Sequence, residues 1–315
     1  MPTSARVQHA SSLQVPACTA HTMHSITVCT FAPMFAPLRQ LLQPPSGMSI
    51  DFTQPARSPA LAPADGISWR VFSNPVTLFI GGVTAVLLEL AEPRVRTGVW
   101  EHSSFRRDPL GRLHRTGYAA MVTVYAPQDQ ARALIARVVR MHDHVKGLTP
   151  DGTPYHANHP ELLDWVQATA IFGFTQAFDR YAQALHPHEK DQAFAEGQAS
   201  AQLYGATGLP HDWLGWQTLL ARTAPQLQDH AIVAEFLHIM RTTALLPGPF
   251  QAFQRLLVQA AIDITPAPVR QFAAPNGECL RPWQQHLVGA LARTAQQLQL
   301  PQLPPSQARK RMRAG

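Results

Sequence analysis

The sequence predicts an all-α fold, with a single multi-helix domain and flexible segments at both ends. Apolar residues recur at helical spacing from Trp69 onward, and prolines and glycines mark where most of these runs begin or end. No two runs alternate as paired strands would, and no internal repeat is visible. Hydrophobic residues make up 45% of the 315 residues and charged residues 15%, so the chain can bury a sizeable core.

Composition divides the chain into three segments. Residues 1–65 are rich in Pro, Ser, Thr and Ala and lack a sustained period, which predicts a flexible N-terminal segment. Translation from Met48 would leave most of this segment out, and a transit peptide is the alternative explanation. Residues 66–300 form the expected helical domain, and residues 301–315 form an expected basic C-terminal tail.

The net charge of +6 is confined to the two ends of the chain. The excess consists of Arg6, Arg39, Arg309, Lys310, Arg311 and Arg313. Without these six, 20 of the 26 basic residues remain, which balances the 20 acidic ones. A nucleic-acid backbone would require a basic face spread over the fold, so we expect no nucleic-acid partner.

The longest apolar stretch, Pro75–Leu90, is interrupted by Gly81-Gly82 and is followed by charged residues. A spanning helix needs about 18 or more consecutive apolar residues, so we expect a buried helix and no transmembrane segment. Peripheral contact with a membrane stays compatible with the sequence, and the expected location is cytoplasmic. The sequence makes no prediction of the oligomeric state.

The first three expected helices lie before residue 147. One covers Leu78–Glu92 and stops at Pro93, because proline cannot donate the next helical hydrogen bond. Another opens at Pro109 and runs to about Tyr125, since proline suits the first position of a helix. The third covers Gln128–Val145, and Gly147 is its expected C-cap.

A fourth helix is expected to begin at Pro160 and to run toward Tyr181. Asn158 and Glu161 resemble a capping box, in which two side chains satisfy free backbone N–H groups at the helix start. The apolar spacing predicts further helices over residues 189–205, 212–222, 230–245, 249–263 and 281–298.

One histidine of the expected helix 128–145 faces the core, and a second faces water. At about 100° per residue, His142 falls about 20° from Ile135, within the arc of Val138 and Val139. His144 falls on the opposite face. A buried imidazole needs a partner for each ring nitrogen, and a metal ion satisfies one of them. A hydrogen-bonded core histidine is the plainer alternative.

The expected helix that opens at Pro109 places Arg112 and Thr116 on one face, four residues apart. An arginine cannot lose its charge to enter a core, so a buried Arg112 would need an anionic partner. The alternative is a solvated basic face, which the nearby Arg106 and Arg107 favour.

Several motifs follow one another in an order that carries a family resemblance. They are GGVTAVLLELAEP (Gly81–Pro93), GVWEHS (Gly98–Ser103), RLHRT (Arg112–Thr116), MHDHVKG (Met141–Gly147), DGTPYHAN (Asp151–Asn158) and PELLDWVQAT (Pro160–Thr169). With this order and spacing, about residues 70–245 resemble the MpaB and latex-clearing-protein family of haem-dependent oxygenases.

The resemblance implies a b-type haem in a buried pocket, held by one protein histidine. The ligand position falls on His142, in a His-x-x-Val motif, which is the residue that the helical wheel turns toward the core. Residues near the haem in relatives correspond to Arg112 and Thr116, and the cationic residue before the threonine corresponds to Arg115. A glutamate that serves as a candidate base there corresponds to Glu92, although the spacing differs from that of the rubber-cleaving branch.

The implied activity is that of an oxidoreductase, a haem b-dependent oxygenase that uses dioxygen as co-substrate. Such relatives cleave carbon–carbon double bonds of isoprenoid chains, so a small apolar substrate is expected. Glu92 stands where many relatives have histidine, and His159 stands where an aspartate cap is common.

Two other functions remain open from the residues alone. A non-haem metal site would use the cluster His142, His144, His156 and His159. His142 and His144 are about 160° apart on one helix, so a regular helix would prevent both from binding the same ion. A non-catalytic helical protein that has kept the fold is the second alternative.

Overall fold

The computed structural model describes residues 44–45, 48–244, 251–297 and 300–314. Within these ranges the fold is helical apart from one short hairpin, so the predicted all-α fold is confirmed. Residues 1–43, which make up most of the expected N-terminal segment, lie outside the described residues.

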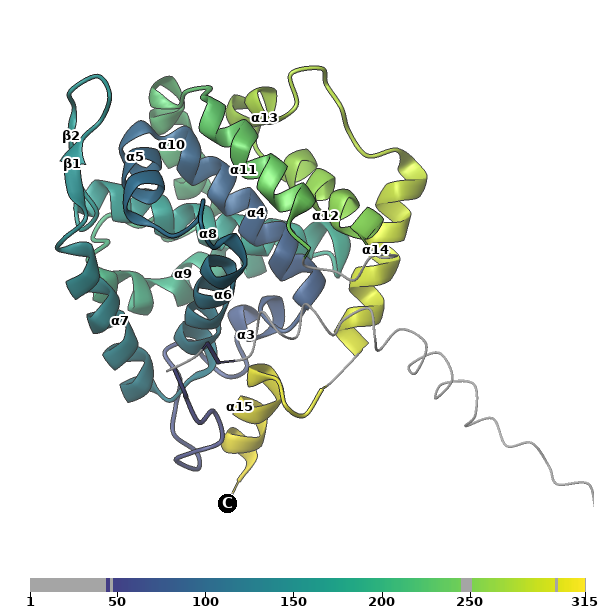
Figure 1. Cartoon of the computed structure of the whole chain (residues 1–315). Helices are drawn as coiled ribbons and strands as arrows, with labels where there is room; N and C mark the ends of the chain where they lie inside the picture. Colours follow the sequence, from purple (N-terminus) through teal and green to yellow (C-terminus); the bar gives the residue numbers. More distant parts are fainter. Residues whose placement is uncertain (1–43, 46–47, 245–250, 298–299, 315) are drawn as a thin grey trace, which may run out of the picture.

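Two long helices, α4 (Pro75–Ala91) and α8 (Pro160–Tyr181), pack against each other at the centre of the molecule (Figure 1). Their backbones meet at glycines: a Cβ added to Gly173 would lie 2.5 Å from the carbonyl oxygen of Gly81. Any side chain at this crossing would push the helices apart, so the glycines set their separation. α4 begins before the expected Leu78 because the Asn74 side chain caps it, accepting from two backbone N–H groups.

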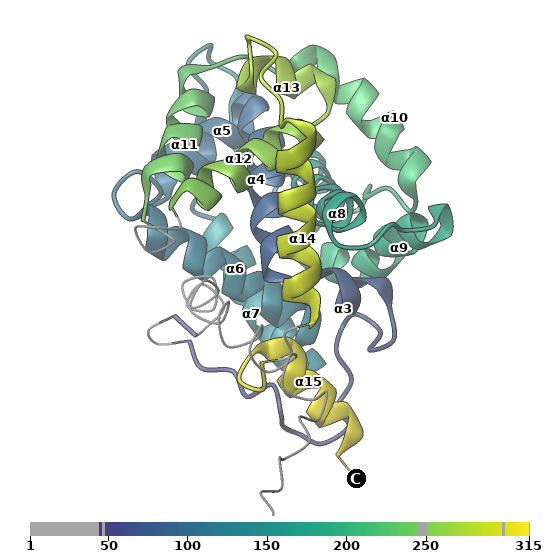
Figure 2. The ribbon, with the colours of Figure 1, turned by 90° about the vertical axis from the view of Figure 1, so that its right-hand side faces the viewer.

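Further helices surround this central pair. In α12 (Gln251–Ile264), the Ala261 carbonyl accepts a 3.0 Å hydrogen bond from Thr84 Oγ1 of α4. Figure 2 shows α14 (Pro282–Gln297) lying along one side of α4 and α8. The other helices are α3 (Ile67–Val71), α5 (Pro93–His102), α9 (Pro187–Tyr204), α10 (Trp213–Thr223), the 3-10 helix η2 (Ala224–Gln226), α11 (Ala231–Thr242) and α13 (Ala267–Ala273).

The helices α6 (Pro109–Tyr125) and α7 (Gln128–His142) form an adjacent pair. α7 ends earlier than predicted, because the chain leaves it for the antiparallel strands β1 (Lys146–Leu148) and β2 (Pro154–His156). The predicted helical C-cap at Gly147 is therefore wrong. Gly147 lies in β1 opposite Tyr155, whose hydroxyl oxygen would be 2.8 Å from an added Cβ, so a larger residue would displace the ring.

The C-terminal segment is part of the packed fold, and the expected flexible tail at residues 301–315 is wrong. Pro304–Arg313 form α15, and the Arg311 side chain is fully buried. Its Nε donates to the Ser58 carbonyl (2.9 Å) and its Nη1 to the Phe52 carbonyl (2.8 Å). These bonds join α15 to the segment before α3, so the packed chain extends beyond residues 66–300 on both sides.

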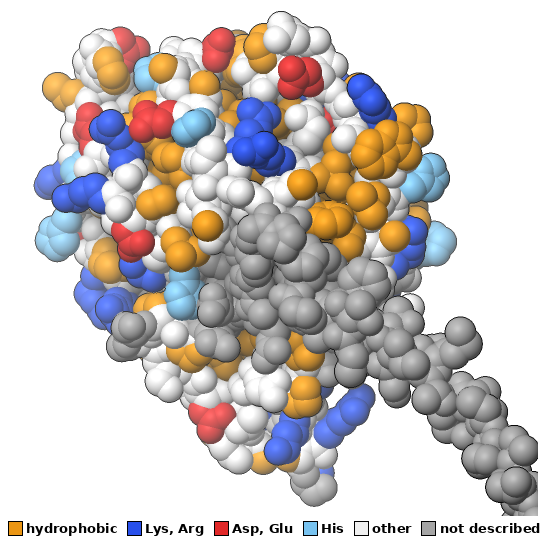
Figure 3. Space-filling model, turned by 45° about the vertical axis from the view of Figure 1, so that its right-hand side comes forward, with side chains coloured by type: hydrophobic (Ala, Val, Ile, Leu, Met, Phe, Trp, Pro, Cys, Tyr) orange, Lys and Arg blue, Asp and Glu red, His pale blue; other side chains and the backbone are white. Residues whose placement is uncertain are grey.

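No single helix within the described ranges is long and apolar enough to cross a membrane. The pair formed by α4 and α5 has the necessary length and composition, but it is bent by 109° between them. Side chains of both charges are scattered over the face shown in Figure 3.

Candidate functional site

His142 is the last residue of α7 and lies on its packed side. The helix buries Ala131, Leu134 and Ile135, and His142 follows Ile135 by seven residues, which is close to two turns. His142 is partly buried and His144 is exposed, as the helical wheel predicts. Burial lowers the pKa of the His142 imidazole, and the nearby Arg112 charge lowers it further, while a contact with Asn158 acts in the opposite direction.

Asn158 links the end of α7 to the hairpin and lies beside His142. Its amide nitrogen donates to the Val139 carbonyl (3.0 Å) and to Asp143 Oδ1 (2.7 Å). Because both neighbours are acceptors, the amide cannot be reversed, and its oxygen must face the other way. The prediction that Asn158 caps α8 is therefore wrong; the N-cap is His159, without a side-chain bond.

Two buried polar atoms near this link lack a hydrogen-bond partner within the described chain. They are Nδ1 of His142 and Oδ1 of Asn158. The ring nitrogen Nδ1 can carry a proton and donate a hydrogen bond, and the amide oxygen Oδ1 can accept one, so the two atoms form a complementary donor and acceptor. A proton on Nδ1 would leave Nε2 of His142 with a free lone pair, which is the form of imidazole that binds a metal.

Arg112 of α6 lies near Glu89 of α4, an acid on an otherwise apolar helix. Burial raises the pKa of the Glu89 carboxyl to about 7, and the Arg112 charge only partly offsets this effect. Burial also lowers the pKa of the Arg112 guanidinium, which Glu89 in turn raises. Arg112 also contacts the Thr116 hydroxyl, which donates to the Arg112 carbonyl at 2.8 Å. Protein atoms thus surround both charges, although some side-chain surface stays accessible.

The other two predicted site residues have partners of their own. Arg115 is exposed; its Nη2 donates to Ser104 Oγ at 2.6 Å, and its Nη1 lies 3.4 Å from Asp108 Oδ2. Glu92 is buried between α4 and α5, where it caps α5 by accepting from the Val95 N–H at 2.8 Å. It also forms a 2.7 Å ion pair with the Nε of Arg94.

The structure therefore brings these residues together around Arg112. Its charge acts on both His142 and Glu89, and its side chain contacts the Thr116 hydroxyl. Glu89 was not predicted as a site residue. Its signal in the sequence is an ionisable group inside the apolar run Gly81–Ala91, and a perturbed carboxyl beside a cation is a common mark of a functional site.

Across the ranges that the structure describes, no three His, Cys, Asp or Glu side chains converge as a group able to hold a metal ion. A haem requires no such group, because the porphyrin supplies four iron ligands and one imidazole is sufficient on the protein side.

A family model described as "ER-bound oxygenase mpaB/B'/Rubber oxygenase, catalytic domain" matches residues 69–312. The match extends from α3 through most of α15, which agrees with the packing of both ends. Neither the curated proteins nor the solved structures contain a match to the chain.

Proposed function

Because the chain belongs to the family of the ER-bound oxygenases mpaB and B' and rubber oxygenase, we propose that it is a haem b-dependent oxygenase in which His142 would be the protein ligand of the haem iron. The observation that carries the ligand assignment is the buried Nδ1 of His142, which has no hydrogen-bond partner within the described residues although the side chain of Asn158 lies near the ring. This pair favours the tautomer in which Nε2 is free. The depressed pKa of the imidazole also keeps it neutral and available at neutral pH.

The residues around His142 fit a haem in charge as well as in ligand type. Arg112 is a desolvated cation whose carboxylate neighbour, Glu89, has a pKa of about 7 and so neutralises it only in part. A haem propionate or a developing negative charge would complete this neutralisation. α4 is apolar around Glu89, where Leu87, Leu88 and Leu90 are buried in the core, so this carboxyl lies in an apolar environment.

When bound, the haem iron supplies the binding and activation of dioxygen. Arg112 offers a partly desolvated positive charge, and a charge held in place stabilises developing negative charge without first reorganising. Thr116 positions the guanidinium through their contact. Glu89 is close to half-protonated at neutral pH, so its carboxylate can accept a proton and return it.

We further propose that the reaction is cleavage of a carbon–carbon double bond in an apolar, isoprenoid-like substrate. Both atoms of one dioxygen molecule add to the two alkene carbons, the bond between those carbons breaks, and two carbonyl groups form. The atoms and electrons of this reaction balance without an external reductant.

Absorption spectroscopy of the purified full-length protein tests the cofactor, and a matched pair of variants tests the ligand. We expect a Soret band in the wild type, loss of most bound haem in His142→Ala, and haem retention in His144→Ala, because His144 is exposed on the other face. Equal retention in both variants would contradict the ligand assignment. Bound metal without a Soret band would favour a non-haem enzyme, and neither would favour a non-catalytic protein.

A further inference from the structure

The basic residues of the C-terminal helix divide into two groups. Arg311 is buried and bonded to backbone carbonyls, so its role is structural. Arg309 and Arg313 lie on another face of α15, four residues apart, and line a cavity of about 160 Å³. The haem proposal does not involve this cavity.

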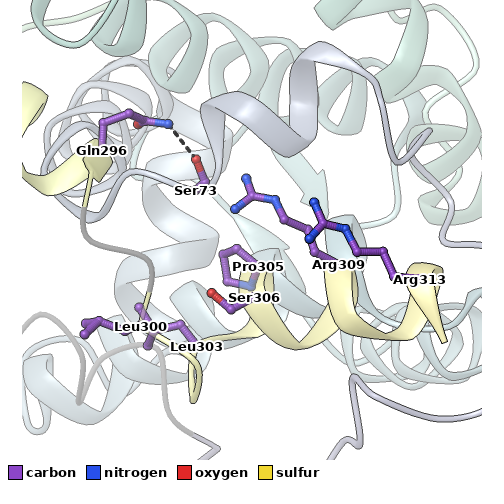
Figure 4. Close-up of a pocket in the computed structure, with 8 residues that line it drawn as sticks. All are labelled: Ser73, Gln296, Leu300, Leu303, Pro305, Ser306, Arg309 and Arg313. Carbon is purple, nitrogen blue, oxygen red and sulfur yellow. Dashed lines mark hydrogen bonds between the residues drawn. The ribbon is translucent and has the colours of Figure 1, made fainter.

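The cavity lies between α15 and the residues at the start of α4 and the end of α14. Its polar lining consists of Arg309, Arg313, Ser306, Ser73 and Gln296, and it contains no acidic side chain. Figure 4 shows both arginine side chains extending from α15 toward Ser73. One buried water needs only about 10–15 Å³, so the space is ample for a small oxyanion.

Ser73 and Gln296 form a fixed wall of the cavity. Gln296 Nε2 donates to Ser73 Oγ (3.0 Å), and Gln296 Oε1 accepts from Asn74 Nδ2 (2.9 Å). Ser73 Oγ in turn donates to the Arg70 carbonyl at 2.8 Å. Because these side chains already form hydrogen bonds with their neighbours, they shape the cavity but do not serve as partners of Arg309 and Arg313.

The opposite wall presents donors without acceptors. Within the described part of the chain, the side chains of Arg309, Arg313 and Ser306 form no ion pair or hydrogen bond. Ser306 also lies in the first turn of α15, where the helix dipole is positive. Two like charges on successive turns repel each other, and a bound anion would remove that repulsion.

We propose that this cavity binds a phosphate-type oxyanion, with Arg309 and Arg313 as its charged ligands and Ser306 as a hydroxyl donor. Guanidinium groups match the geometry of phosphate oxygens, and paired arginines are a common means of recognising them. The anion is either a free phosphate or the phosphate of a lipid headgroup, and both offer the same oxygens to the site.

Calorimetric titration of the full-length protein with inorganic phosphate tests the site directly. We expect saturable binding in the wild type and a loss of roughly tenfold or more in the Arg309→Gln, Arg313→Gln double variant, because charge-assisted bonds are lost. The matched control is the Lys310→Gln, Arg281→Gln double variant, which removes the same charge from exposed positions outside the cavity. It should bind within about twofold of the wild type if local contacts dominate.

The single variant Arg313→Gln should fold normally, because Arg313 is exposed, so it separates a loss of binding from a folding defect. We expect it to bind phosphate several-fold more weakly than the wild type. Sedimentation with vesicles of phosphatidylcholine, with and without phosphatidic acid, distinguishes a lipid phosphate from a free phosphate. Recruitment that is lost in the cavity variant but kept in the control identifies a lipid phosphate, whereas phosphate binding without recruitment identifies a soluble one. Equal losses in both double variants, or no binding of either probe by the wild type, would overturn the proposal.

Discussion

His142 Nδ1 and Asn158 Oδ1 are a complementary donor and acceptor, both are buried, and neither has a hydrogen-bond partner within the described residues. The orientation of Asn158 is fixed from its other end, where the amide nitrogen donates to Val139 and Asp143. Asn158 therefore holds the end of α7 in place and also lies near the imidazole ring of His142. Imidazole ligands commonly donate their second N–H to such a neighbour, which fixes the ring and its tautomer.

Asn158→Leu is predicted to weaken haem binding by roughly 10- to 100-fold, the usual cost of losing such a partner of a metal ligand. His159→Ala is the control, since His159 is adjacent and exposed and its side chain makes no capping bond. Nitrogen-15 NMR of the haem-free protein provides an independent measurement. We expect the proton of His142 on Nδ1 in the wild type, and a mixture of tautomers in the variant. Unchanged tautomers would contradict the role of Asn158 even if His142 proves to be the ligand.

Glu89 is predicted to make the stability of the haem-free protein depend on pH. Its pKa rises from 4.5 to about 7 on folding, so between these values the folded state binds more protons than the unfolded state. This contribution to stability is complete below pH 4.5 and is lost as pH rises through 7. The shift corresponds to at most ~3 kcal/mol.

Chemical denaturation from pH 4.5 to 8 measures this effect. Glu89→Gln should flatten the pH dependence and unfold at higher denaturant than the wild type at pH 8. Glu278→Gln, at an exposed position, should leave the profile unchanged. If Glu89→Gln has the same slope as the wild type, the carboxyl is not desolvated as the structure indicates.

Arg112→Ala is predicted to lower turnover by roughly a hundredfold while the protein retains its helical signal and haem. A preorganised donor directed at developing charge is worth about 3 kcal/mol, which corresponds to that factor. Arg255→Ala is the control and should change turnover little, because Arg255 is exposed on α12. Haem occupancy and dioxygen consumption are measured together. A loss of haem with full activity per haem would instead assign Arg112 to a propionate.

Local signals in the sequence predicted helix starts well. Pro109 and Pro160 each open a helix at the expected residue, since proline tolerates the first helical position. The early end of α7 is not predictable locally, because a glycine after a helix also suits a C-cap, whereas Gly147 packs against the Tyr155 ring in the hairpin. That contact is tertiary, and the two residues meet only once the hairpin forms.

The candidate site shows the same contrast between local sequence signals and tertiary contacts. His142 followed from the helical wheel, because α7 presents a continuous apolar face. Glu89 and Arg112 lie on different helices, so neither residue's desolvation could be inferred before the helices were placed. Arg311 is a stronger case: in the sequence it belongs to a basic run, and only backbone carbonyls from a segment about 250 residues earlier explain its burial.

Arg311→Ala is predicted to destabilise the protein by about 3 kcal/mol, because one buried and one partly buried carbonyl lose their donor and a large buried side chain is removed. Lys310→Ala is the matched control, since this neighbour is exposed and should change stability by about 0.5 kcal/mol or less. Chemical denaturation of both variants measures the difference.

A shortened chain shows whether Arg311 stabilises the protein through the carbonyls of Phe52 and Ser58. A chain that begins at Pro59 lacks both Phe52 and Ser58, so it is itself destabilised and Arg311 has no carbonyl partner left there. The substitution should then cost far less in the shortened chain than in the full one, because mutations that remove the same interaction are not additive. Equal costs in the two backgrounds would mean that Arg311 stabilises α15 through the helix itself, and that the N-terminal segment is not bound by it.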